Sequence, residues 1–295
     1  MKQKATAAII CTGILWGIIS IFVKGMAAAG LTLMQTVLLR CFFAGCGVAV
    51  LLLCTDRSKF RIHLRDIWMF IGTGIVSLVI FNRCYMYTMT HDNASVGAVL
   101  LYTSPIFIML FSAVLFKEKI TLKKLLALLL TFLGCALVSG IAGGSSAVPL
   151  DVVLYGIGAG FFYSLYTVFG KFALKKYDSA TITVYTFLFA VLGSLPFAQI
   201  PTLVHTVTKS PSVLLWGLGI GILCTAIPYF LYTWGLSHME SGRAAIIVAV
   251  EPVVGAVVGI AVFHEDCSAL KIVGILCVLL AIIILNLPNK NEVKS

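Results

Sequence analysis

Two stretches of sequence decide the fold: residues 125–141, LLALLLTFLGCALVSGI, and residues 272–287, IVGILCVLLAIIILNL. Neither stretch contains a charged side chain, and apolar residues fall on every face of a helix drawn through them. Strands of a membrane barrel would instead alternate polar and apolar residues over segments of about 10 positions. Both stretches therefore predict helices in a lipid bilayer, where a crossing takes about 20 mostly apolar residues.

The composition extends this prediction to the whole chain. Its 295 residues are 60% hydrophobic and only 11% charged, and the mean hydropathy is +1.07. A soluble domain carries about 25% charged residues, so this class is excluded. Nine cysteines occur without a C-x-x-C pair or interleaved histidines, and phosphate-binding loops and nucleophile elbows are absent. The sequence predicts no metal, no cofactor and no enzyme activity.

Glycines, prolines and charged clusters divide the chain into an all-α polytopic membrane protein with ten transmembrane helices. The expected spans are residues 5–26, 32–54, 66–88, 94–115, 121–141, 152–173, 180–200, 212–235, 242–263 and 269–287.

The basic residues between the spans predict the orientation. With the N-terminus inside, sixteen Lys and Arg residues fall on the cytoplasmic side and four on the other, with Arg40 inside a span. This asymmetry is typical of the positive-inside rule. It also accounts for the net charge of +10 without a nucleic-acid partner. We therefore expect a multi-pass protein of the cytoplasmic membrane with both termini in the cytoplasm.

An internal repeat predicts the architecture. A shift of 147 positions superimposes rare residue types on one another, including His91 on His238, Pro105 on Pro252 and Glu118 on Glu265. Each half then has five spans, and an odd number requires the second half to be inverted. The expected units are a first repeat (1–141), a flexible connector (142–151), a second repeat (152–287) and a cytoplasmic tail (288–295).

Several motifs resemble a known family. Residues 98–118 and their later copy 244–265, together with residues 13–17 (GILWG) and 39–43 (LRCFF), resemble the two EamA repeats of the drug/metabolite transporter superfamily. The resemblance covers essentially the whole chain. It implies ten helices, cytoplasmic termini and transport of small metabolites such as amino acids and their relatives, often outward. In the family, the ninth helix usually ends in Gly-Glu. This chain has His264-Glu265 at that place and Lys117-Glu118 at the corresponding place in the first copy.

Two charged residues lie near the middle of predicted spans. Arg40 is about 12 Å into the second span and Glu251 is about 14 Å into the ninth, from the opposite side. A charge at this depth is costly, so each group is expected to face protein or a watery cavity and to have a partner. Two interpretations stay open. In the first, the two residues form a fixed ion pair, or each caps backbone carbonyls separately. In the second, Arg40 binds a substrate carboxylate, or Glu251 binds a substrate ammonium or a proton.

Other residues inside the spans could line the same pocket or pack structurally. Pro105 and Pro252 each remove a backbone donor at matching positions, which predicts paired helix breaks at a binding site or simple kinks. The candidate pocket residues are Trp16, Asn82, Tyr102, Tyr163 and Tyr229. Four aromatic residues nearer to span ends are assigned to the interfacial belt instead: Tyr85, Tyr87, Tyr232 and Trp234.

These observations favour a secondary transporter that moves a small polar metabolite by alternating access, in the exporting direction. The alternatives are a lipid or glycolipid carrier and a non-transporting membrane scaffold or enzyme. The expected partners are a small-molecule substrate and membrane lipids, and the sequence leaves open whether the chain forms a homo-oligomer. Substrate identity and the coupling ion are not determined by the sequence.

Overall fold

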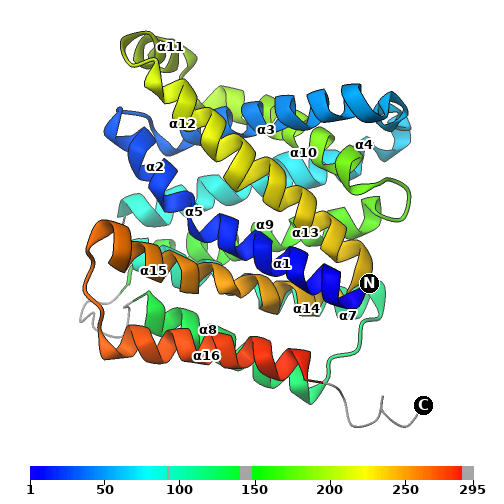
Figure 1. Cartoon of the computed structure of the whole chain (residues 1–295), viewed down its shortest axis with the longest axis vertical. Helices are drawn as coiled ribbons and strands as arrows, with labels where there is room; N and C mark the ends of the chain where they lie inside the picture. Colours follow the sequence, from blue (N-terminus) through cyan, green and yellow to red (C-terminus); the bar gives the residue numbers. More distant parts are fainter. Residues whose placement is uncertain (92–93, 140–147, 288–295) are drawn as a thin grey trace.

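The computed structural model describes residues 1–91, 94–139 and 148–287 of the chain. Every regular element in this part of the chain is a helix. Figure 1 shows the helices packed side by side, with α8 and α16 together at one edge and α11 at the opposite edge. The prediction of an all-helical membrane protein is confirmed.

Nine helical stretches among the described residues are long and apolar enough to cross a membrane. They are Gln3–Ala28, Leu33–Thr55, Leu64–His91, Val96–Phe116, Leu150–Ala173, Ser179–Phe197, Ser212–His238, Ser241–Phe263 and Ala269–Asn286.

The elements that make up the first half run to residue 138. They are α1 (Lys2–Gly17), α2 (Ile19–Ala28), α3 (Leu33–Thr55), η1 (Arg57–Phe60), η2 (Leu64–Asp66), α4 (Ile67–Ile71), η3 (Gly72–Val79), α5 (Ile80–His91), α6 (Ala94–Leu101), α7 (Ser104–Phe116) and α8 (Leu122–Val138).

The second half begins at residue 150. Its elements are α9 (Leu150–Ala173), α10 (Ser179–Ser194), η5 (Leu195–Phe197), α11 (Ile200–Lys209), α12 (Ser212–Gly221), η6 (Ile222–Ala226), α13 (Ile227–His238), α14 (Ser241–Ile247), η7 (Val248–Val250), α15 (Glu251–Phe263) and α16 (Ala269–Asn286).

The helix α8 occupies the position of the predicted fifth span. It has 17 residues, so it is shorter than the nine stretches above, and it packs along α16. Gly134 permits this close approach, because a Cβ atom there would lie 2.8 Å from the Gly274 carbonyl oxygen. Most of the predicted connector 142–151 and the predicted tail 288–295 lie outside the described residues, and α9 begins at Leu150.

Residues 147 positions apart have the same local structure in the two halves. Lys117 and His264 both adopt left-handed conformations, with φ of 56° and 55°, directly after α7 and α15. Thr121 and Ser268 then cap α8 and α16 by accepting a hydrogen bond from a backbone N–H three residues later. The connection between α7 and α8 and the connection between α15 and α16 lie at opposite ends of the molecule (Figure 1).

Two long spans contain π-helical turns at corresponding places. The first is η3, between α4 and α5, and the second is η6, between α12 and α13. Such turns widen a helix locally and are frequent at functional sites. The sequence analysis did not anticipate them.

The fourth and ninth spans are interrupted just before their prolines. The helix α6 ends at Leu101, and α7 begins at Ser104 with Pro105 in its first turn. Similarly, the 3₁₀ turn η7 separates α14 from α15, which has Pro252 in its first turn. Proline has no backbone N–H to continue the preceding helix, which explains the position of both breaks.

The first helix of each half packs against the broken span of the other half. A Cβ atom on Gly13 of α1 would lie 2.7 Å from the Val248 carbonyl oxygen in η7. A Cβ atom on Gly160 of α9, which is 147 residues later, would lie 2.3 Å from Thr103 Oγ1 in the break between α6 and α7. These contacts bring α1, α9 and the two breaks together in the middle of the molecule.

Candidate functional site

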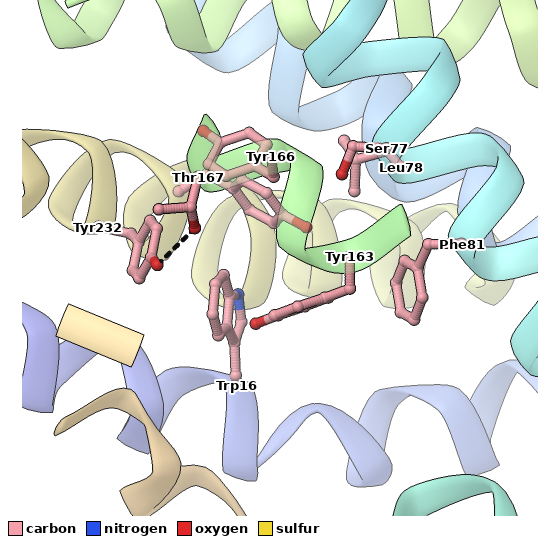
Figure 2. A pocket seen from close by; sticks show the side chains of 9 residues that line it. Trp16, Ser77, Leu78, Phe81, Tyr163, Tyr166, Thr167 and Tyr232 are labelled. Carbon is pink, nitrogen blue, oxygen red and sulfur yellow. Dashed lines mark hydrogen bonds between the residues drawn. The ribbon is translucent and has the colours of Figure 1, made fainter. Parts of the chain in front are cut away.

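The candidate site consists of two adjoining cavities that share Tyr163. The first cavity is narrow, with a volume of about 10 Å³, and lies between α1, α9, α13 and the span that contains η3 and α5 (Figure 2). It is lined by Trp16, Ser77, Leu78, Phe81, Tyr163, Tyr166, Thr167, Tyr229 and Tyr232.

Aromatic rings pack around Trp16 in this cavity. Its ring centroid lies 5.2 Å from that of Tyr229, 5.8 Å from that of Tyr232 and 6.3 Å from that of Tyr163. The contacts with Tyr163 and Tyr229 are edge-to-face, which is a favoured geometry of aromatic pairs. Figure 2 shows Trp16 and Tyr163 pointing toward one another from α1 and α9. The rings present apolar faces together with a few polar atoms.

Two hydrogen bonds between α9 and α13 fix the tyrosines of the cavity wall. The Tyr232 hydroxyl lies 2.8 Å from Thr167 Oγ1 (Figure 2), and the Tyr166 hydroxyl lies 2.8 Å from Thr233 Oγ1. All four side chains are buried. Buried hydroxyl groups need such partners, so these two bonds hold the aromatic rings in fixed positions.

The second cavity lies at the two helix breaks. It has a volume of about 20 Å³, and its lining includes Tyr102, Ser104, Pro105, Tyr163 and Glu251. Ser104 and Glu251 are 147 residues apart in the sequence, so equivalent positions of the two halves face one cavity. Only the second half supplies a carboxylate at this position.

Arg40 on α3 reaches toward α5. Its Nη2 atom donates a hydrogen bond of 3.4 Å to Asn82 Oδ1, which is longer than the usual 2.9 to 3.0 Å. Asn82 in turn donates a hydrogen bond of 2.7 Å to the Leu78 carbonyl oxygen, and Leu78 lines the first cavity. The Nε atom of Arg40 is buried without a hydrogen-bond partner. The guanidinium group is therefore incompletely satisfied.

The structure does not contain the predicted ion pair between Arg40 and Glu251. Among the described residues, no cation lies within 4.0 Å of the Glu251 carboxylate and no hydrogen bond reaches it. Arg40 lies beside the first cavity and Glu251 lines the second. The fixed ion pair is not formed in this conformation, and substrate binding by either residue stays a prediction.

The predicted site residues divide between the two cavities. Trp16, Tyr163 and Tyr229 line the first, and Tyr102, Tyr163, Pro105 and Glu251 line the second. Arg40 and Asn82 lie beside the first cavity, because Asn82 bonds to both Arg40 and the carbonyl oxygen of Leu78, which lines that cavity. Pro252 is buried next to Glu251 and does not line either cavity. Whether these residues bind a substrate stays a prediction.

One assignment from the sequence is wrong. Tyr232 was expected in the interfacial belt, but it is only 3% exposed and lines the first cavity. The reason is that α13 continues to His238, which puts Tyr232 more than one turn inside the helix. Tyr166 and Thr167 were also missed, although they follow Tyr163 at helical spacing and share its face.

The described residues also include no group of three or more His, Cys, Asp or Glu side chains that could hold a metal ion. The cavity linings offer one carboxylate together with several hydroxyl and aromatic groups, and the Arg40 guanidinium group lies beside the first cavity. Such a set can bind and orient a small molecule.

Comparison with known proteins identifies the family. An uncharacterized transporter of Archaeoglobus fulgidus is 29% identical over 282 residues, covering 94% of both chains. The uncharacterized transporter YetK of Bacillus subtilis is 24% identical and covers 85% of this chain and 78% of its own. A solved crystal structure that is 17% identical matches with a TM-score of 0.84 over the full length of both chains, which shows a shared fold. The sequence model of the EamA-like transporter family matches twice, at residues 3–140 and 151–287. The chain therefore belongs to the EamA-like transporter family, a membrane transporter family of the drug/metabolite transporter superfamily.

Proposed function

We propose that this protein is a secondary transporter that exports a small polar metabolite, amino-acid-like in size and charge, across the cytoplasmic membrane by alternating access. The observation that carries the proposal is the separation of Arg40 and Glu251. Glu251 lines the second cavity, Arg40 lies beside the first, and the two groups do not contact each other. A ligand with an anionic and a cationic end would satisfy both.

The cost of unpaired groups supports this proposal. The Nε atom of Arg40 is buried without a hydrogen-bond partner, and a polar group buried in this way costs free energy, most of all inside a membrane. A substrate carboxylate would accept hydrogen bonds from Arg40, since a guanidinium group matches a carboxylate in two-point contact. A substrate ammonium would donate to Glu251, and a proton on Glu251 would serve the same electrostatic purpose when the substrate lacks an ammonium group.

The cavities are narrow in this conformation. With volumes of about 10 and 20 Å³, each has room for about one water molecule, so a substrate would enter only when the surrounding helices move apart. The aromatic walls are held by buried hydrogen bonds. These features favour a compact metabolite over a bulky hydrophobic cation.

The arrangement of the two halves supports alternating access. Two family repeats, local structures that recur 147 residues apart and ends that lie on opposite sides of the molecule (Figure 1) fit ten spans in two inverted repeats. Inverted repeats supply two equivalent conformations that open to opposite sides. Both termini would then be cytoplasmic, as the basic residues indicate.

The test is counterflow transport in proteoliposomes loaded with amino acids, carboxylates, nucleobases or quaternary amines. We expect exchange of at least one zwitterionic or anionic compound, and we expect Arg40→Gln to abolish it. The matched control is Arg83→Gln, which alters an exposed arginine on α5 that packs over Phe197. Exchange of quaternary amines alone would contradict the proposal, and movement of lipid alone would favour a lipid carrier.

A further inference from the structure

A broad cavity lies at the end of the molecule that the basic residues assign to the cytoplasm. It has a volume of about 820 Å³ and lies between the ends of α7, α9, α13 and α16 and the beginning of α8 and α14. Five of its lining residues are cations: Lys119, Lys123, Lys124, Lys171 and Arg243. We call it the basic cavity.

The two carboxylates in the lining of the basic cavity already have partners. Glu118 accepts hydrogen bonds from the Ser241 backbone N–H at 2.8 Å, the Ser241 hydroxyl at 2.9 Å and the Gly242 N–H at 3.3 Å. Glu240 forms an ion pair of 2.6 Å with Lys124. Lys124 is thus the cation of this cavity that a carboxylate neutralises directly.

The other four cations have no carboxylate within 4.0 Å in the part of the chain that the structure describes. Lys123 donates to the carbonyl oxygen of Leu287, and Arg243 donates a hydrogen bond of 2.6 Å to Asn286. The Nε atom of Arg243 is buried without a partner. These neutral acceptors leave the positive charge uncompensated, and cations gathered in one cavity create a potential that attracts anions.

The internal repeat separates the cations into two groups. A shift of 147 positions puts Lys124 and Lys171 on lysines of the other half. Both hold the connection between α13 and α14, Lys124 through its ion pair and Lys171 through hydrogen bonds of 2.9 Å to two carbonyl oxygens. The same shift puts Lys119, Lys123 and Arg243 on Asp266, Leu270 and Val96. The architecture common to both halves therefore does not explain these three cations.

Two apolar stripes extend along the edge of the molecule from the basic cavity. Exposed residues at helical spacing form one stripe on α8: Leu122, Leu126, Leu129 and Leu133. The other stripe, on α16, consists of Leu276, Leu280, Ile283 and Leu287. The last of these also lines the cavity, and α8 and α16 pack side by side (Figure 1). In a bilayer such stripes contact acyl chains, so the cavity lies at the level of the lipid headgroups.

We propose that the basic cavity binds the phosphate group of an anionic phospholipid of the cytoplasmic leaflet, whose acyl chains lie along α8 and α16. Phosphate oxygens accept charge-assisted hydrogen bonds from ammonium and guanidinium groups, which Lys119, Lys123 and Arg243 supply. Basic pockets between membrane helices on the cytoplasmic side are typical sites for such headgroups. A soluble phosphate offers the same chemistry but would not use the apolar stripes, so the structure favours the phospholipid.

The test measures the thermal unfolding midpoint of the purified full chain in a neutral detergent mixed with one of two lipids. Dioleoylphosphatidylglycerol and dioleoylphosphatidylcholine have the same acyl chains, but only the first carries a net charge. A ligand that binds the folded state raises the midpoint. We expect the midpoint to rise with the mole fraction of phosphatidylglycerol and not with that of phosphatidylcholine. Equal rises with the two lipids overturn the proposal.

A double variant locates the effect in the cavity. We expect Lys119→Gln combined with Lys123→Gln to raise the half-saturating mole fraction of phosphatidylglycerol about tenfold or more. The matched control combines Arg57→Gln and Arg61→Gln, which removes two exposed charges at the same end but outside the cavity lining. We expect the control to change the half-saturating mole fraction by less than about twofold, because salt screens exposed charges. Equal weakening in both double variants would indicate a general attraction of surface charge and overturn the proposal.

Inorganic phosphate distinguishes the two sources of the anion. We expect no rise of the midpoint when it replaces the lipid at the same phosphate concentration, and a rise equal to that with phosphatidylglycerol overturns the assignment to a phospholipid. Where the double lysine variant is not monodisperse, Arg243→Gln is measured instead, and an unchanged half-saturating mole fraction overturns the proposal. The measurement needs no cargo, so its outcome is independent of the transport assay.

Discussion

Arg40 has a buried Nε atom without a partner and one long hydrogen bond to Asn82. A residue kept only for structure would be expected to satisfy its hydrogen bonds more completely. Lysine in its place would retain the positive charge but could not offer the planar, two-point contact that a carboxylate accepts. The substitution Arg40→Lys therefore separates a structural role from a binding role.

We expect Arg40→Lys to give a monodisperse protein and to lower the rate of counterflow by about tenfold or more. The measurement compares yield by size exclusion with transport rate in the same preparation. Arg83→Lys is the control. A second variant carries both Arg40→Glu and Glu251→Arg, which keeps the net charge and reverses the charges beside the cavities. Wild-type rates for both Arg40→Lys and this exchange would show that neither residue contacts the substrate.

The sequence predicted part of the candidate site at this scale. Trp16 and Tyr163 could be found because they occupy the same position in both repeats, and both line the first cavity. Tyr232 was misassigned because a residue's depth depends on where its helix ends, and hydropathy defines an end only to within a few residues. The separation of Arg40 from Glu251 could not be predicted, because equal depth in a membrane does not determine the distance between two side chains.

At the level of elements, glycines determine how closely the spans approach. Gly74 lies in η3, where a Cβ atom would be 2.5 Å from the Thr186 carbonyl oxygen and 2.9 Å from the Ala190 nitrogen of α10. These are backbone atoms that cannot rotate away. Gly158 of α9 offers a contrast, because the nearest atom to an added Cβ is Cys84 Sγ at 3.7 Å, an ordinary contact distance.

We expect Gly74→Ala to destabilise the protein by about 1 to 3 kcal/mol, because α10 and η3 must move apart. Gly158→Ala should be neutral or slightly stabilising, since alanine favours a helix more than glycine does. The measurement is the thermal unfolding midpoint of both variants in the same detergent. Equal unfolding midpoints for the two variants would contradict this expectation, since they would show that α10 can move away from η3 without loss of stability.

The cap of α10 is joined to η1 by an ion pair. Asp178 accepts a 2.8 Å hydrogen bond from the Thr181 N–H and forms a 2.9 Å ion pair with Lys59 in η1. Burial acts to raise the pKa of Asp178, but the bonds from Thr181 and Lys59 outweigh burial, and the pKa lies below its ordinary value. A lowered pKa means that the stabilising effect is present above about pH 4 and disappears as the pH falls through the folded-state pKa.

We expect Asp178→Ala to cost about 1 kcal/mol at neutral pH through loss of the cap. Asp178→Asn should cost less, since asparagine also caps helices, but its stability should fall less steeply than that of the wild type below about pH 5. The measurement is the unfolding midpoint at several pH values. Asp266→Asn, at an exposed carboxylate, is the control. Parallel pH curves for the wild type and Asp178→Asn would contradict the assignment.

The positions of the spans could be predicted from the sequence, but the π-helical turns within them and the short helix α11 could not. Runs of apolar residues and basic clusters locate the spans because insertion in lipid depends on total hydrophobicity. The helix α11 was missed, since its ten residues carry too few apolar side chains to resemble a span. The π-helical turns in η3 and η6 were missed as well, because an extra residue in a turn is accommodated by packing against neighbouring helices and leaves no periodic signal.

At the scale of the whole molecule, the inverted arrangement makes a direct prediction about sidedness. In a cysteine-free background, Ser58→Cys in η1 should react with an impermeant reagent only from the cytoplasmic side. Lys209→Cys at the end of α11 should react only from the outside. Both native side chains are exposed, so access does not limit the reaction. Labelling of both positions from one side of intact cells would exclude the proposed orientation.

The count of five spans in each repeat predicts the inversion, and the connections that precede α8 and α16 lie on opposite sides of the molecule (Figure 1). The partners of the two equivalent glutamates could not be predicted. Glu118 accepts hydrogen bonds from Ser241, whereas Glu265 lies 3.3 Å from Lys271, and such contacts depend on the packing of the folded chain.

The shortness of α8 and α16 has a consequence for the surrounding lipid. At a rise of 1.5 Å per residue, their 17 and 18 residues extend about 26 and 27 Å, whereas the hydrocarbon layer is about 30 Å thick. The two helices lie side by side at the edge of the molecule (Figure 1). The difference between helix length and hydrocarbon thickness is therefore concentrated at this edge. Lipids next to this edge must compress their acyl chains, and the protein should unfold at a higher temperature in bilayers of shorter-chain lipids than in bilayers of longer-chain lipids.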